Sequence, residues 1–164
     1  MTILRTTLHN PPDVPAPAGN YSHVARLELG DGALLIVSGQ LALGADGQVI
    51  GAGDMARQSD RVFEILGAIL AAHDATLADA INIRTYLTDI SLIDDYATAR
   101  ARHLENPPPT STTVEVSRLL IPGALVEVDL MATAPPAPAV SPSPRDRTVG
   151  SCESSGVSVR GAQR

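Results

Sequence analysis

Hydrophobic and polar residues follow two different periods along this chain, and these periods predict strands and helices in turn. Short stretches that alternate in polarity, or that are rich in β-branched and aliphatic residues, are typical of β-strands. Two longer stretches repeat apolar residues every three or four positions, as helices packed on one side do. The predicted strands are residues 2–8, 21–29, 33–38, 80–89, 111–116 and 125–131, and the predicted helices are residues 54–73 and 91–105.

Turn and capping residues mark the boundaries of these elements. A Gly-Asp-Gly turn at residues 30–32 predicts a hairpin, Asp54 predicts a helix N-cap, and Asp74 predicts a left-handed residue after that helix. The order of three strands, a helix, a strand, a helix and two strands predicts an α+β domain whose mixed sheet carries both helices on one face. Because an uncovered sheet face of this size usually finds a partner, we expect an oligomer.

The last predicted strand places two carboxylates on one face of the sheet. Residues two apart in a strand share a face, so Glu127 and Asp129 project together between apolar neighbours. If that face is covered, both groups need partners, since an unpaired buried charge is costly. The alternative is a solvated edge strand. The residues of this face are Leu125, Glu127, Asp129 and Met131, and those of the opposite face are Val126, Val128 and Leu130.

Composition removes several classes of function. The chain has no lysine, which excludes a Schiff-base lysine and a P-loop lysine. A formal net charge of −6, with only three tyrosines, one phenylalanine and no tryptophan, argues against a nucleic-acid partner. Cys152 is the single cysteine, so no internal disulfide forms. The four histidines are scattered without metal-ligand spacing, and we expect no metal.

The chain divides into a domain at residues 1–133 and a C-terminal tail at residues 134–164. The tail is rich in Pro, Ser and Arg and poor in large apolar residues, which predicts disorder. Neither a signal peptide nor a stretch of 18 apolar residues is recognisable, so we expect a cytoplasmic protein without a membrane segment.

Four segments together resemble the RidA/YjgF (reactive intermediate deaminase) family over about residues 15–133. They are AGNYSHVARL at 18–27, LIVSGQLALGADGQVIGAGDMARQSDRVFEILGAIL at 35–70, HDATLADAINIRTYLTDI at 73–90 and TTVEVSRLLIPGALVEVDLMA at 112–132. The resemblance implies a chorismate-mutase-like homotrimer with clefts between subunits. It also implies hydrolysis, without a cofactor, of reactive enamines and imines to a keto acid and ammonia.

The resemblance assigns the candidate site residue by residue. Glu127 matches the glutamate thought to hold or activate the attacking water, and Tyr21 matches the tyrosine of the cleft. Ser111 and Thr112 lie in the segment that binds the substrate. The remaining segment that lines the cleft is Ser38, Gly39 and Gln40.

The chain departs from the family at the residue that grips the substrate carboxylate. The family has an arginine in a Pro-Ala-Arg-Ser-x-Val segment, and this position holds Ser111. Serine supplies neither the charge nor the two-pronged geometry of a guanidinium. An asparagine expected early in the second helix is also absent, with Ala97 as the nearest match. The arginines that could substitute are Arg84, Arg100 and Arg118, the last being typical of the family at a surface position.

Three functions remain open on this basis. The first is a divergent hydrolase or deaminase acting on a small C=N or carbonyl compound, with Glu127 as general base and its pKa raised by burial. The second is a non-catalytic trimer that binds a small metabolite or a partner protein, which the missing arginine favours. The third is ribonuclease activity, against which the acidic charge and the scarce aromatic residues argue.

Overall fold

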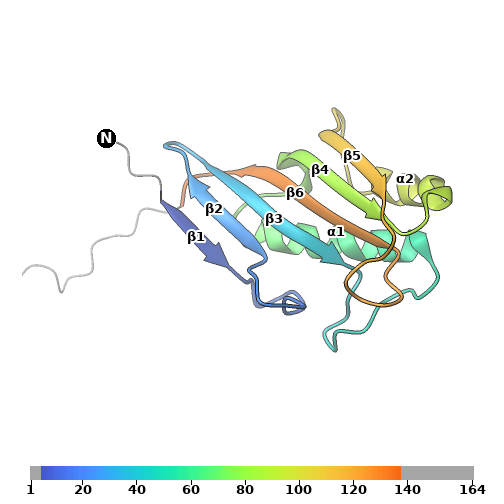
Figure 1. The fold of residues 1–164 in the computed structure, drawn as a ribbon. Coiled ribbons are helices and arrows are strands. Elements are labelled where there is room, and N and C mark those ends of the chain that lie inside the picture. Colours follow the sequence, from blue (N-terminus) through green and yellow to red (C-terminus); the bar gives the residue numbers. More distant parts are fainter. Residues whose placement is uncertain (1–4, 138–164) are drawn as a thin grey trace, which may run out of the picture.

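A computed structural model describes residues 5–137 of the chain, and they form one sheet backed by two helices (Figure 1). The start of the predicted first strand and residues 138–164 of the predicted tail, with Cys152, lie outside the described residues. The strands are β1 (Thr6–His9), β2 (Val24–Glu28), β3 (Ala33–Leu41), β4 (Ala80–Leu87), β5 (Thr110–Glu115) and β6 (Val126–Ala134). The helices are α1 (Met55–Ala71) and α2 (Ile93–Ala101), with 3-10 turns at η1 (Leu77–Asp79) and η2 (Ile90–Leu92).

The sheet has six strands in the order β1-β2-β3-β6-β4-β5. Neighbouring strands run antiparallel except for β4 and β5, which pair in parallel. The sheet is therefore mixed, and both helices lie behind it in the view of Figure 1, as the element order predicts. The last strand in the sequence, β6, lies in the middle of the sheet between β3 and β4.

Helix α1 begins and ends where its capping residues predict. The Asp54 carboxylate accepts the backbone N–H of Arg57 at 3.0 Å, which satisfies one of the free donors of the first turn. Asp74, just past the helix, has a φ of 57° and adopts the left-handed conformation expected of it. The apolar stripe between these ends packs on the sheet and includes Val62, Phe63, Leu66, Ile69 and Leu70, all buried.

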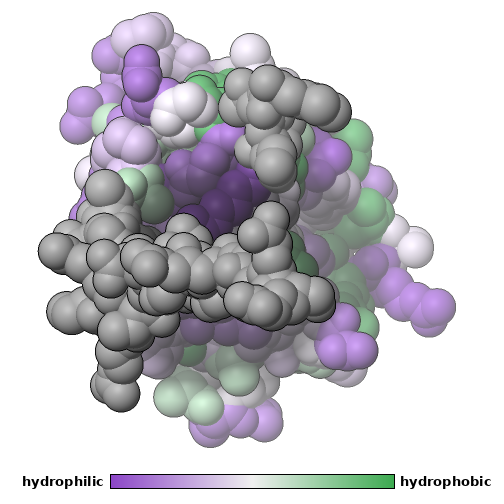
Figure 2. All heavy atoms as spheres, turned by 90° about the vertical axis from the view of Figure 1, so that its left-hand side faces the viewer, coloured by the Kyte–Doolittle hydropathy of each residue, from purple (hydrophilic) through white to green (hydrophobic). Residues whose placement is uncertain are grey.

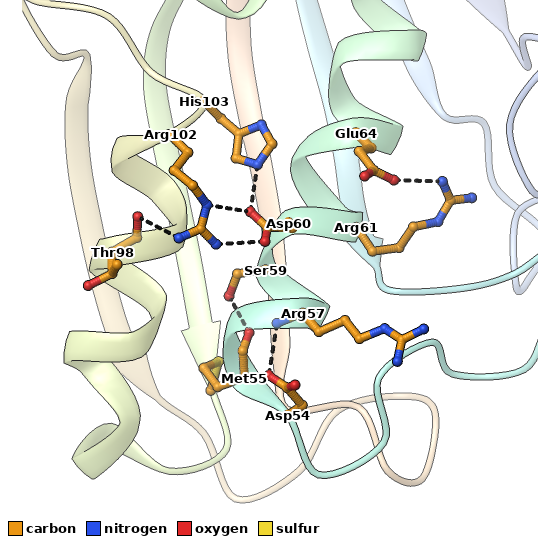
Figure 3. Close-up of polar contacts among 10 residues, drawn as sticks. All are labelled: Asp54, Met55, Arg57, Ser59, Asp60, Arg61, Glu64, Thr98, Arg102 and His103. Atoms are coloured by element: carbon orange, nitrogen blue, oxygen red, sulfur yellow. Dashed lines mark hydrogen bonds and ion pairs between the residues drawn. The ribbon is translucent and has the colours of Figure 1, made fainter.

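A polar cluster joins α1 to the end of α2 on the outer side of the molecule (Figure 3). The Asp60 carboxylate accepts from Arg102 Nη2 at 2.6 Å and from Nε at 3.2 Å, and His103 Nε2 lies 2.8 Å away. Hydrogen bonding from Arg102 lowers the pKa of Asp60. The His103 ring also stacks on buried Phe63 with 5.3 Å between ring centres. This cluster fixes the end of α2 against the first helix.

The two faces of the sheet differ in what covers them. The face toward the helices carries the core of aliphatic side chains, including Leu35, Val37, Val126 and Val128. The opposite face has no element of the described chain packed across it, and Ile36 and Val114 remain 37% and 40% exposed there. A sheet face that leaves apolar side chains uncovered in this way is a candidate surface for association.

Figure 2 shows the end of the molecule that lies at the left of Figure 1, near β1 and β2. Hydrophilic and hydrophobic residues are interspersed on it. Near this end, Arg26 is buried and its Nε donates to Glu28 at 2.8 Å. Among residues 5–137, neither helix has the length and apolar character that crossing a bilayer requires.

Candidate functional site

A β-bulge in β3 shapes the candidate site. Val37 pairs with Leu130 and Gln40 pairs with Val128, so Ser38 and Gly39 together oppose the single residue Asp129. Two residues against one bend the strand and redirect its side chains, a device often found beside functional sites. The Ser38 hydroxyl donates to the backbone carbonyl of Ser22 at 2.7 Å, which ties the bulge to the chain leading into β2.

A cavity of about 400 Å³ opens at this bulge on the uncovered face of the sheet. Four of the residues predicted for the site line it: Tyr21, Ser38, Gly39 and Glu127. Its wall also contains Arg84, Leu120 and Asp129. The cavity is thus partly apolar, with two carboxylates at its base, and it is large enough for a small metabolite.

Glu127 is the group of greatest chemical interest in this cavity. Burial raises the pKa of its carboxyl group, and the neighbouring Asp129 charge raises it further. Within residues 5–137, no side chain or backbone N–H donates a hydrogen bond to it, and no arginine pairs with it. The carboxylate therefore faces the cavity with its acceptor capacity available for water or ligand.

Gly39 makes room for that carboxylate. A Cβ atom built at this position would overlap the Glu127 side chain, so only glycine fits against the carboxylate in this arrangement. The resemblance assigns the Ser38-Gly39 segment to the cleft. The close approach of the Glu127 carboxylate explains why the second residue of this segment is a glycine.

Asp129, the second carboxylate, is held by β4. Arg84 lies directly opposite it and donates from Nε at 2.8 Å, while the Tyr86 hydroxyl donates at 3.1 Å. The hydrogen bond to Asp129 raises the pKa of Arg84, and burial together with the Asp129 charge raises that of Tyr86. The Arg84 guanidinium thus pairs with Asp129 and not with Glu127. The negative charge of Asp129 therefore stays close to the Glu127 carboxyl group.

The sequence did not predict this network, although it offered a partial signal. Arg84 and Tyr86 are two residues apart in a predicted strand and so share a face. Which strand they face, and in which register, depends on a pairing between residues more than forty positions apart. That pairing is invisible in the local pattern.

Tyr21 lies on the loop before β2, at the rim of the cavity. Its side chain is 40% exposed, and its hydroxyl accepts the backbone N–H of Ala18 at 3.2 Å. This contact uses a lone pair of the hydroxyl oxygen, so the hydroxyl proton is free to be donated to a substrate in the cavity.

Gln40 points away from the cavity and is buried in the protein. Its Nε2 donates to the Ser38 carbonyl at 2.9 Å and lies 3.2 Å from His23 Nδ1. Because His23 Nε2 is 2.8 Å from the Pro15 carbonyl, that nitrogen carries the proton and Nδ1 accepts from Gln40. Gln40 thus supports the bulge and the incoming loop, and its predicted contact with substrate stays a prediction.

Ser111 and Thr112 lie apart from the other site residues. They are on β5, which is separated from β6 by β4, so about 10 Å of sheet intervenes. Thr112 pairs with Arg84 on the uncovered face, whereas Ser111 pairs with the buried Ile83 on the helix side. One chain thus brings Tyr21, Ser38, Gly39 and Glu127 together but does not place them beside β5.

The residues available for metal binding are also dispersed. Across residues 5–137, no three His, Cys, Asp or Glu side chains are grouped so that they could hold a metal ion. Of the two carboxylates in the cavity, Asp129 is already paired with Arg84.

A mixed six-stranded sheet backed by two helices, with an acidic cavity at a strand bulge, defines the structural class of this chain. The family model described as Endoribonuclease L-PSP matches residues 12–134. The chain belongs to this family, the RidA/YjgF family.

Curated relatives and solved structures agree with this assignment. A RutC family protein of Sulfurisphaera tokodaii is 30% identical over 119 residues, covering 73% of this chain and 91% of the relative. Protein DfrA of Myxococcus xanthus is 29% identical over 132 residues, covering 80% and 98%. The crystal structure of RidA from a Psychrobacter species superposes with a TM-score of 0.68 at 26% identity, covering 78% and 98%. Yeast Mmf1 shares the fold at 21% identity, with a TM-score of 0.70 over 79% and 99% of the two chains.

Proposed function

We propose that this protein is a cofactor-independent hydrolase that converts small imines or enamines into the corresponding carbonyl compound and ammonia. The observation that carries the proposal is Glu127, a half-buried carboxylate with a raised pKa and no described protein partner, facing a cavity of about 400 Å³. A carboxylate in this setting is a stronger base than one in water, and its acceptor sites are open to a water molecule.

The reaction requires one water and no redox step. An enamine first tautomerises to the imine. Glu127 accepts a proton from water as the water oxygen bonds to the imine carbon, and it passes this proton to the imine nitrogen. The resulting carbinolamine loses ammonia as the C–N bond breaks and the carbonyl forms. Glu127 relays the proton from oxygen to nitrogen, so it ends the cycle as a carboxylate. Tyr21 and the backbone near Gly39 border the cavity and are placed to orient the substrate.

The proposal includes a homotrimer in which β5 of one subunit completes the cavity of the next. Two observations support it. Ser111 and Thr112 lie on β5, away from the cavity of their own chain. The uncovered sheet face carries exposed apolar side chains, and closing it against another subunit would bury both the face and the cavity.

A second candidate function is a non-catalytic trimer that binds a small metabolite. The observation that favours it is Ser111, which stands where the family pattern has the carboxylate-binding arginine. The ribonuclease activity in the description of the family model is a weaker candidate, because the net charge of the chain is −6 and two carboxylates line the cavity.

Ammonia release from a panel of imines tests the proposal. An amino-acid oxidase generates 2-imino acids with short apolar side chains in the assay, and an amine oxidase generates uncharged imines from simple amines. We expect the wild type to accelerate release over the spontaneous rate and Glu127→Gln to lower the acceleration by about 100-fold or more. Saturable binding of the corresponding carbonyl compounds without any acceleration would instead support the binding function.

A further inference from the structure

A second cavity lies on the opposite side of the sheet edge from Glu127. It has a volume of about 450 Å³ and is enclosed by α2, the loop that follows it and the start of β5. Most of its wall is apolar, with Ala97, Leu104 and Pro108 among its lining residues. The polar residues of the wall include Arg100, Glu105 and Ser111.

Arg100 approaches Ser111 directly across this cavity. Its Nη1 donates to the Ser111 hydroxyl oxygen at 3.1 Å, which joins the last turn of α2 to β5. The Arg100 side chain therefore reaches from its helix toward the edge of the sheet. A guanidinium therefore stands next to the very position at which the family pattern has one.

The Arg100 guanidinium has most of its donors free. It makes no ion pair within residues 5–137, whereas Arg26, Arg61, Arg84 and Arg102 each contact a carboxylate. Of the five N–H donors of a guanidinium, only the one to Ser111 meets a protein acceptor in the described chain. A cation in the last turn of a helix is stabilised by the helix dipole, and because the contact with Ser111 is exposed, the other donors of Arg100 are open to water or a ligand.

We propose that Arg100 binds the carboxylate of the ligand, in place of the arginine that the family carries on the strand. The guanidinium comes from α2 instead of β5, and the Ser111 hydroxyl orients it and offers its own O–H to the same anion. This inference rests on the proposed function, because the Arg100 cavity of one subunit meets the Glu127 cavity of another only in the proposed homotrimer, and it names the substrate class of that shared site. The apolar wall fits a short aliphatic body, and the Glu105 carboxylate disfavours a second negative charge. The ligand is thus a small monocarboxylate, such as a 2-imino or 2-oxo acid.

The inference also separates the three arginines that the sequence leaves open. Arg84 is engaged by Asp129 at 2.8 Å, so its guanidinium is already paired with a carboxylate. Arg118 follows β5 and is exposed, and it lines neither of the two cavities. Only Arg100 among them contacts Ser111.

Calorimetric titration with 2-oxobutanoate, which has no C=N bond, tests this inference without requiring turnover. The comparison ligands are 2-butanone, which lacks the carboxylate, and 2-oxoglutarate, which carries two. We expect Arg100→Gln to weaken 2-oxobutanoate binding by about tenfold or more, with Arg100→Lys partly retaining it, because the guanidinium contributes a charge-assisted hydrogen bond. The matched control Arg118→Gln should change the affinity by less than about twofold.

Selectivity separates ligand binding from a structural role of Arg100. Wild type should prefer 2-oxobutanoate over both 2-butanone and 2-oxoglutarate, and Arg100→Gln should abolish the preference over 2-butanone with an unchanged oligomeric state. Undetectable binding of 2-oxobutanoate to wild type would overturn the inference, as would equal affinities of wild type and Arg100→Gln.

The outcomes also separate this inference from the proposed function. Glu127-dependent ammonia release that is unaffected by Arg100→Gln would refute the role of Arg100 and leave the hydrolase intact. Arg100-dependent binding of 2-oxobutanoate without ammonia release from any imine would support the carboxylate site and refute the hydrolase.

Discussion

The Glu127 carboxylate occupies the space that a side chain at Gly39 would fill. The two residues lie on neighbouring strands, at the bulge where β3 and β6 lose their regular pairing. This contact couples the backbone of one strand to the position of the proposed catalytic base on the other.

Replacing Gly39 by alanine should therefore displace Glu127. We expect Gly39→Ala to cost less than about 1 kcal/mol of stability, because the Glu127 carboxyl group can move into the cavity, and to lower imine hydrolysis by about tenfold because the carboxylate is displaced. Urea denaturation and ammonia release measure the two effects. Gly67→Ala is the matched control, because its Cβ would be 3.9 Å from the nearest atom, in Leu77. On a helix this second change should stabilise by about 0.5–1 kcal/mol.

Glu127 should make the protein less stable at neutral pH than a neutral residue would. Because burial raises its folded-state pKa above 4.5, the folded protein binds the proton more tightly than the unfolded chain, and stability falls as pH rises through that interval. Glu127→Gln should thus increase the free energy of unfolding at pH 7, and the gain should disappear as pH approaches 4.5.

Urea titrations at several pH values check this dependence. The control Glu64→Gln removes an exposed carboxylate of α1 and should change stability by less than about 0.5 kcal/mol. A loss of stability in Glu127→Gln at pH 7 would indicate that a neighbouring subunit supplies a cation to Glu127.

The acid side of the pH–rate profile should report the same carboxyl group. Hydrolysis requires the Glu127 carboxylate, so the rate should fall as pH drops through its raised pKa. Asp129→Asn removes the adjacent negative charge but keeps an acceptor for Arg84, and should move that limb to lower pH. Since burial is the larger cause of the raised pKa, the limb should remain above the range of a solvated glutamate. An unmoved limb would mean that another group controls the rate.

An arginine placed on β5 should compensate for the loss of Arg100 from α2. The double variant Arg100→Gln/Ser111→Arg should recover about tenfold or more of the 2-oxobutanoate affinity that Arg100→Gln loses. Ser111→Arg alone places two guanidinium groups together and should gain less than the double variant does. Equal affinities of the double variant and Arg100→Gln would show that β5 and α2 do not serve the same anion.

Charge on the uncovered sheet face should dissociate the proposed homotrimer. Val114 is 40% exposed on that face, and Val114→Glu should produce a monomer in light scattering with little loss of secondary structure. Ile90→Glu alters a residue of similar exposure, 44%, in the turn before α2 and should leave the trimer intact. A monomeric wild type at micromolar concentration would contradict the shared site.

Sequence patterns predicted the elements of this fold because their signals are local. The caps at Asp54 and Asp74 and the apolar stripe of α1 lie within one stretch of chain. The predicted bounds of that helix, residues 54–73, are therefore close to those of α1. The second helix is shorter than predicted, since residues 90–92 form a 3-10 turn and α2 ends at Ala101. The order in which the strands pair is not local, and the residue pattern did not predict it.

Gln40 illustrates what the pattern could not supply at the site. A regular strand would place Gln40 on the face opposite to Val37, which is the face of the cavity. The bulge adds one residue between them, so Gln40 turns to the covered side and meets His23. The contact of Arg100 with Ser111 likewise joins a helix to a strand, and residue spacing gave no reason to choose it over Arg84 or Arg118.

The central place of β6 has a consequence for synthesis of the protein. Strands β3 and β4 are both synthesised before β6, and each of them pairs with β6 along one of its edges. A nascent chain that ends before residue 126 therefore exposes two unpaired strand edges, which are prone to associate with other chains. The sheet can therefore close only after residues 126–134 have left the ribosome.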